Sequence, residues 1–290
     1  DEWTKNVANS GLPTRSVWKS YQFKLWSGMK YGIGATPATI EELEKGLGKS
    51  DHKLLSYLGV CRNIATQWRY LPPNYGGIGL NSLLCEATSA SLNVFLQHFS
   101  TETSLGHFLT ASIENLQLEL GVAGCPFKYD YEIWGELATA SWVKALWERI
   151  HHFKIDIEME YPTLKSPREY DECIMEKLVK QGVRGSELVS LNRVRKHQES
   201  IFISDIATAN GKRVDPIYFS SWHKSYERAL GKRRSRFIYG EERPSDEDWK
   251  TWRKKLSRKT PGYQILDRDL GKWRNRSPRI WRAFWNEDSV

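Results

Sequence analysis

Apolar side chains recur at every third or fourth position along most of this chain, which is the spacing of one face of an α-helix. The stretch 13–31 shows it first, with Val17, Tyr21, Leu25 and Met29 four residues apart. The same spacing returns over residues 36–47, 50–58, 83–99, 104–120, 129–153, 168–181 and 186–209. The sequence therefore predicts a mainly α fold, a multi-helix body with a few short strands.

Start and stop residues mark the ends of two of these helices. Thr39 and Glu42 have the spacing at which each side chain caps the backbone of the other, so a helix should begin there. Gly121 follows the stretch 104–120 and predicts its end, because glycine readily adopts the left-handed conformation that closes helices.

Three segments depart from the helical spacing. Residues 71–80 combine two prolines with three glycines, which no regular element can contain. Apolar and charged residues alternate over 154–161, which predicts a half-buried strand that Pro162 ends. Asn210 and Gly211 fit either a hairpin turn or a helix cap, and the helical spacing before them favours the cap.

Size and polarity limit the class of protein. The 290 residues, 40% of them hydrophobic, suffice for one large domain or two small ones, and the mean hydropathy of −0.58 argues against a polytopic membrane protein. The sequence contains no apolar run long enough for a membrane span, and its first residues do not resemble a signal peptide. We therefore expect an intracellular protein with no membrane partner.

Common catalytic and metal-binding motifs are absent from the sequence. The four cysteines form no C-x-x-C pair, and we expect them to be buried free thiols. The seven histidines show no H-E-x-x-H pattern, and no G-x-S-x-G nucleophile elbow occurs. These observations predict no metal and no small-molecule cofactor in this chain.

Charge is distributed unevenly along the chain. The net charge is +8, yet residues 181–290 hold 25 bases and 14 acids, so the remainder is slightly acidic. A basic segment on a near-neutral body favours a polyanion as partner, because neutralised phosphates release counterions. The basic part also holds six of the 13 tryptophans, most of which we expect to pack rather than to stack on bases.

One well-specified helix lies in this basic part, over residues 245–258. Ser245 is its predicted cap, acidic residues follow at the positive end of the helix dipole, and basic residues crowd the negative end. Its apolar stripe consists of Trp249, Trp252 and Leu256, and the cations that point away from the stripe are Lys250, Arg253 and Lys254.

Dense cation runs make this part a candidate nucleic-acid interface. Such runs can follow a phosphate backbone, so RNA or DNA is the predicted partner, and the same runs also fit a nuclear-import address. The candidate binding residues are Lys232, Arg233, Arg234, Arg236, Lys250, Arg253, Lys254, Lys255, Arg258, Lys272, Trp273 and Arg274. No catalytic residue is assigned.

Several short motifs resemble the region just downstream of the polymerase palm in reverse transcriptases of non-LTR-type eukaryotic retroelements. The matching motifs are Lys30-Tyr31-Gly32, Leu58-Gly59-Val60-Cys61-Arg62-Asn63, Gly76-Gly77-Ile78-Gly79-Leu80, Leu191-Asn192-Arg193-Val194-Arg195, Ser204-Asp205-Ile206-Ala207, Asn210-Gly211-Lys212-Arg213, and residues 244–256 with Leu270-Gly271-Lys272-Trp273. The resemblance implies a thumb-like and C-terminal part of an RNA-directed DNA polymerase, whose palm and fingers would be a further partner.

One departure from that family bears on activity. Polymerase chemistry in the family rests on palm carboxylates, including a Tyr-x-Asp-Asp element that holds Mg²⁺, and this sequence has no such element. The segment Tyr170-Asp171-Glu172 comes nearest and lacks the paired aspartate. We therefore expect this chain alone to bind nucleic acid without polymerising it.

These predictions divide the chain into three parts and leave two other functions open. The parts are a helical, thumb-like body over 1–161, a helical connector over 162–219 and a basic, tryptophan-rich module over 220–290. One alternative is a retroelement-derived interaction module whose basic tail docks an acidic protein. The other is a metal-dependent nuclease that uses Asp267 and Asp269, although such acids more often pair with neighbouring cations.

Overall fold

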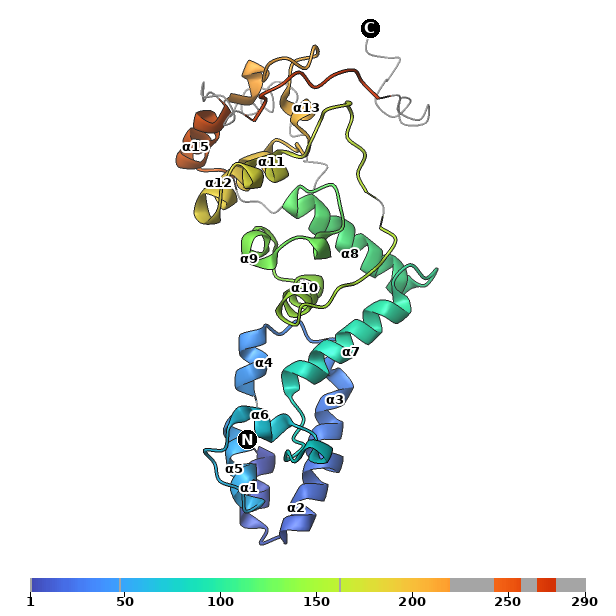
Figure 1. The fold of residues 1–290 in the computed structure, drawn as a ribbon, viewed down its shortest axis with the longest axis vertical. Coiled ribbons are helices and arrows are strands. Elements are labelled where there is room, and N and C mark those ends of the chain that lie inside the picture. The colour runs from blue at the N-terminus through green and yellow to red at the C-terminus, as the bar shows by residue number, and fades with distance from the viewer. Residues whose placement is uncertain (1, 47, 162, 220–242, 257–264, 275–290) are drawn as a thin grey trace. The chain divides into compact units, whose positions relative to one another are not determined.

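A computed structural model shows a mainly α-helical protein (Figure 1). It describes residues 2–46, 48–161, 163–219, 243–256 and 265–274. The chain forms two compact units, Asp1–Ser112 with Ala140–Ile157 and Ile113–Thr139 with Glu158–Val290. We call these unit 1 and unit 2 and describe each by itself.

Unit 1 is built from helices joined by short loops. Its elements are α1 (Glu2–Asn9), α2 (Thr14–Ser20), the π-helical η1 (Tyr21–Trp26), α3 (Ser27–Ile33), α4 (Ile40–Gly46), α5 (Gly48–Tyr57), α6 (Thr66–Tyr70), the 3-10 turn η2 (Pro73–Tyr75), α7 (Leu83–His98) and α10 (Trp142–His152). Helix α8 (Ser104–Leu120) begins in unit 1 and ends in unit 2.

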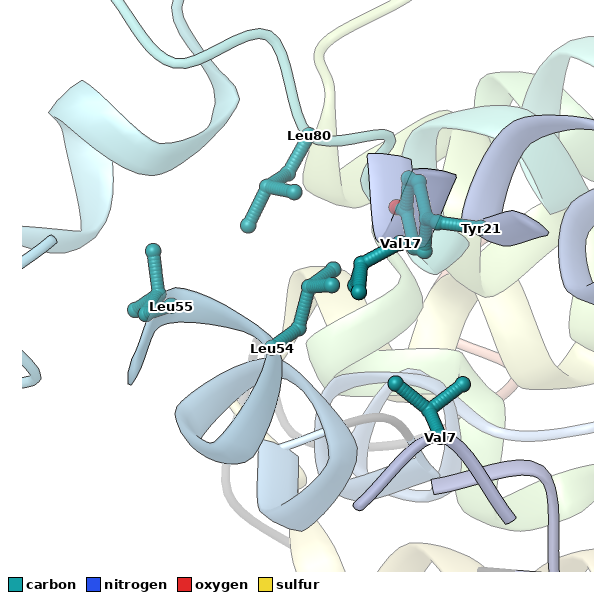
Figure 2. Packing of buried hydrophobic residues seen from close by; sticks show 6 residues of the cluster. All are labelled: Val7, Val17, Tyr21, Leu54, Leu55 and Leu80. Carbon is teal, nitrogen blue, oxygen red and sulfur yellow. The ribbon is translucent and has the colours of Figure 1, made fainter. Parts of the chain in front are cut away.

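One hydrophobic cluster of unit 1 joins α1, α2, η1, α5 and the loop that ends at Leu80. Figure 2 shows its buried residues, with Leu54 of α5 and Val17 of α2 pointing toward one another. The complete cluster is Val7, Val17, Tyr21, Leu54, Leu55 and Leu80. A second cluster, Ile33, Leu43, Leu84 and Ala87, packs α3, α4 and α7 together.

The proline- and glycine-rich segment 71–80 is irregular, as predicted. Its backbone folds back on α6, with the amides of Ile78 and Leu80 donating to the carbonyls of Trp68 and Arg69 at 3.0 and 2.8 Å. A Cβ atom at Gly77 would lie 1.9 Å from the carbonyl oxygen of Leu71, so only glycine fits there. This tight return places Leu80 in the core.

Unit 2 contains shorter helices. They are η3 (Pro126–Lys128), α9 (Tyr131–Trp134), η4 (Gly135–Leu137), α11 (Ile174–Lys180), α12 (Gly185–His197), α13 (Ile203–Ile206), η5 (Pro216–Phe219) and α15 (Asp246–Leu256). Helices α12 and α15 pack side by side (Figure 1). Arg195 of α12 is fully buried and donates to the carbonyls of Leu118 and Glu119, which ties α12 to the end of α8.

Local start and stop signals are confirmed. Thr39 and Glu42 exchange the two hydrogen bonds of a capping box, at 2.9 and 3.3 Å. Helix α8 ends at Leu120, and Gly121 takes the left-handed φ of +69°. Because each signal acts within one helical turn, the sequence contains all that is needed to predict it.

The strand predicted over 154–161 is wrong. Side-chain exposure does alternate along this segment, but no residue in it pairs with another segment in the described structure. A strand needs a partner edge for its backbone groups. The described β structure consists instead of the isolated bridges Arg168–Trp273, Cys173–Phe202 and Ala207–Val214.

Two further local expectations are corrected in unit 2. The helix predicted over 186–209 is interrupted after His197, where Glu199 adopts a left-handed φ of +53°. Asn210 and Gly211 form a turn between bridged segments rather than a helix cap, since the amide of Thr208 donates to the carbonyl of Arg213 at 2.8 Å.

The remaining expectations concern the cysteines, membrane spans and the division of the chain into parts. Cys125 and Cys173 are buried free thiols as predicted, whereas Cys61 and Cys85 are exposed, so that expectation is wrong for these two. Among the described residues, no helix combines the length and the apolar character that crossing a bilayer requires. The three-part division at residues 161 and 219 stays a prediction.

Candidate nucleic-acid interface

Helix α15 is fixed at its start by a reciprocal cap. The hydroxyl of Ser245 accepts from the amide of Asp248 at 3.1 Å, and the Asp248 carboxylate accepts from the amide of Ser245 at 2.8 Å. Ser190 and Arg193 of α12 donate to the same carboxylate at 2.6 and 2.9 Å. Burial alone would raise the pKa of Asp248, but these hydrogen bonds outweigh it and lower that pKa to about 2.

The apolar stripe of α15 is buried, as the spacing predicts. Trp249, Trp252 and Leu256 are at most 6% exposed. The indole of Trp252 donates to the carbonyl of Tyr218 at 2.9 Å, so its polar atom is satisfied in the core. This burial sets which side of α15 faces solvent.

The opposite side of α15 carries the predicted cations. Lys250, Arg253 and Lys254 are all exposed, and we call these three residues the α15 cation face. Lys250 has a long, exposed contact of 3.6 Å with Glu247, which has little stabilising effect. Within the described residues, Lys254 makes no ion pair.

Lys255 is also a predicted binding residue on α15, but its side chain lies against α12. Its side chain is 11% exposed, and its ammonium pairs with Glu187 of α12 at 3.2 Å. The pair anchors α15 to α12, so Lys255 is not part of the α15 cation face. The sequence predicts Lys255 as a binding residue, but it contains no local signal for this pair, because the position of Glu187 depends on how the two helices pack.

The second described group of candidates lies on an extended segment of unit 2. Residues 270–274 pair antiparallel with residues 167–170: the amides of Glu169 and Arg274 donate to the carbonyls of Lys272 and Pro167 at 3.1 and 2.9 Å. Lys272, Trp273 and Arg274 are all exposed. Neither the Lys272 ammonium nor the Arg274 guanidinium forms an ion pair among the described residues.

Arg168 supports this segment from beneath. It is 3% exposed, it donates to the carbonyls of Gly271 and Ala209, and its guanidinium carbon lies 4.0 Å from the centre of the Trp273 ring. A guanidinium over an indole is a favourable cation–π pair. Arg168 therefore fixes the ring that sequence analysis proposed as a candidate.

The other predicted residues lie outside the described part of the chain. They are Lys232, Arg233, Arg234, Arg236 and Arg258. The candidate interface in the structure thus comprises the α15 cation face and the segment 272–274, both within unit 2.

The acids of the nuclease alternative are engaged in other contacts. Asp267 accepts from the Lys177 ammonium at 2.8 Å, and Asp269 accepts from the amide of Gly271 at 2.9 Å. No cluster of three or more histidine, cysteine, aspartate or glutamate residues suited to a metal occurs in the ranges that the structure describes. These contacts give the nuclease alternative no support.

Some residues beside this interface are not among the predicted binding residues. Tyr170 lies at the end of the segment 167–170 that pairs with 270–274, and Lys212 and Arg213 lie in the turn whose Gly211 carbonyl accepts from the amide of Leu270 at 3.3 Å. The residues Asn210-Gly211 allowed a turn, although the helical spacing before them favoured a cap, and no local pattern indicated which segment the turn would meet.

Three comparisons with known proteins were negative. A scan against protein-family models, a search of curated proteins and a search of solved structures each found no match.

Proposed function

We propose that this chain is a non-catalytic nucleic-acid-binding portion of a retroelement reverse transcriptase, which binds RNA or DNA through the phosphate backbone. The observation that carries the proposal is the α15 cation face, which lies opposite the buried tryptophans of the same helix. The resemblance of several motifs to the region downstream of the palm supports a polymerase parent, with palm and fingers as partners and the nucleus as site of action.

Physical chemistry favours a polyanion over other ligands at such a face. Lysine and arginine side chains held on a rigid helix present charge without needing a specific base sequence. The buried stripe and the Ser245–Asp248 cap fix the orientation of the helix, so its cations remain on one side. An interface of this kind gains affinity from released counterions and loses it in salt.

The test is the equilibrium binding of a fluorescent oligonucleotide to the full chain across a salt series. Replacing Lys250, Arg253 and Lys254 together by glutamine should weaken binding for all base sequences alike. The slope of log affinity against log salt should become shallower by about two, since each lost phosphate contact removes about 0.7–0.9 of slope.

A matched control carries the same change in net charge on unit 1. Lys5, Lys45 and Lys53 are exposed there, and their joint replacement by glutamine should leave the salt slope unchanged. An affinity that does not depend on salt, or an equal loss in both triple variants, would contradict the proposal. A preference for acidic proteins over oligonucleotides would favour the interaction module instead.

A further inference from the structure

Two exposed aromatic rings belong to the paired segments 167–170 and 270–274 of unit 2. Tyr170 is 55% exposed and Trp273 is 53% exposed, although large aromatic side chains are usually buried. Arg168 and Trp273 are bridge partners, and the amide of Tyr170 donates to the carbonyl of Leu270 at 3.1 Å, so both aromatic residues are placed by the same pairing. This exposure needs an explanation beyond packing.

The structure holds both rings in place. Arg168 covers one face of the Trp273 indole, and its own hydrogen bonds to Gly271 and Ala209 prevent it from moving away. The Arg268 guanidinium lies 6.0 Å from the centre of the Tyr170 ring and donates to the Tyr170 carbonyl at 3.3 Å. Because the rings are preorganised, a ligand that stacks on them loses little additional side-chain entropy.

Exposed cations occupy nearby positions on the same segment and on the adjoining turn. Lys212, Arg213, Lys272 and Arg274 are exposed on the turn and on the segment that meet at Leu270. Glu169 is the acid within the pair, and its carboxylate accepts from the amide of Lys272 at 3.2 Å. Flat aromatic faces beside positive charges are the combination that binds the bases and phosphates of a single strand.

We propose that Tyr170 and Trp273 form a stacking platform for the unpaired bases of a single-stranded polynucleotide. The inference rests on the proposed function and narrows its substrate class from nucleic acid in general to single strands. Bases in a duplex stack on one another and offer no free face, whereas unpaired bases can lie on an aromatic ring.

The experiment compares three probes with the same number of phosphates on the full chain. They are an oligodeoxythymidine, a dA–dT duplex half as long, whose two strands together hold the same number of phosphates, and an abasic oligonucleotide of the same length as the first probe. The wild type should bind the oligodeoxythymidine most tightly. Tyr170→Leu and Trp273→Leu should each weaken that binding about tenfold and leave the duplex and the abasic strand unchanged. Trp273→Phe keeps a ring and should restore most of the affinity.

The outcomes separate this inference from the proposed function. Equal wild-type affinity for all three probes would overturn the stacking platform and leave backbone binding intact. An unchanged affinity of Tyr170→Leu for oligodeoxythymidine would do the same. The hydroxyl that this variant loses has no hydrogen-bond partner in the described structure. Binding to none of the probes, or equally to a polyglutamate of the same charge, would overturn both.

Discussion

Fully buried arginine side chains hydrogen-bond to separate segments in both units. Arg149 in unit 1 donates to the hydroxyl of Ser91 and the carbonyl of Ala145 at 3.2 and 2.9 Å, and Arg195 in unit 2 donates to carbonyls of α8. Both are fully buried, and these acceptors are neutral oxygens rather than carboxylates. A guanidinium reaches several separate acceptors at once because its donors form a rigid fork.

Asp51 gives a prediction at the residue scale. It is 2% exposed and accepts from the hydroxyl of Tyr70 at 3.0 Å. Burial raises its pKa above the ordinary 3.8, and the bond from Tyr70 offsets this only in part. The folded state therefore holds the proton more tightly than the unfolded state, and stability present at lower pH is lost as pH rises through the folded pKa.

Asp51→Asn should remove that loss. Urea unfolding from pH 3 to pH 7 should show the variant gaining stability relative to wild type as pH rises, because the neutral amide keeps the Tyr70 bond without burying a charge. Glu44→Gln, an exposed site on α4, is the control and should give no such trend. If the free energies of unfolding of Asp51→Asn and wild type differ by the same amount at every pH, the buried carboxylate does not have this effect.

At the scale of elements, one long helix of unit 1 adapts its winding to its side chains. The helix predicted over 13–31 is present as α2, η1 and α3, with a π-helical segment in its middle. A π-helix aligns residues five apart, and Tyr21 and Trp26 are both buried with stacked rings 6.3 Å apart. A four-residue repeat would have placed these two rings on different faces.

The cap of α15 gives a prediction at the same scale. Ser245→Ala removes the acceptor for the amide of Asp248 and should lower the free energy of unfolding by about 1 kcal/mol. Ser186→Ala in the first turn of α12 is a suitable control, since the Ser186 side chain is exposed and makes no hydrogen bond in the described structure. Thermal unfolding of both variants gives the comparison, and equal losses would refute the capping role.

At the scale of the whole molecule, each unit buries apolar side chains of its own, and the charge is distributed unevenly between the units. Unit 1 has its apolar cluster around Leu54 and Val17, and unit 2 buries Leu191, Val194 and Trp252. The excess of cations lies in the sequence of residues 181–290, which belong to unit 2. A core truncation should therefore weaken the unit to which the residue belongs.

Leu54→Ala tests this expectation by hydrogen exchange. Truncating a fully buried leucine costs about 2–5 kcal/mol, so exchange should become faster in peptides from α2, α5 and the segment ending at Leu80. Leu12→Ala, at a site that is 45% exposed, should change exchange little. A uniform increase over all peptides of both units would contradict separate cores.

Local sequence patterns predict the helical class and the helix ends at Thr39, Gly121 and Ser245, because a cap joins residues within one turn. They also predict which side of α15 is apolar, because helical spacing alone sets that. Tertiary packing, by contrast, pairs Lys255 with Glu187, stacks Arg168 on Trp273, and leaves the alternating segment 154–161 without a strand partner in the described structure. Those contacts join residues far apart in the chain, and no local periodicity records which distant segment will supply the partner.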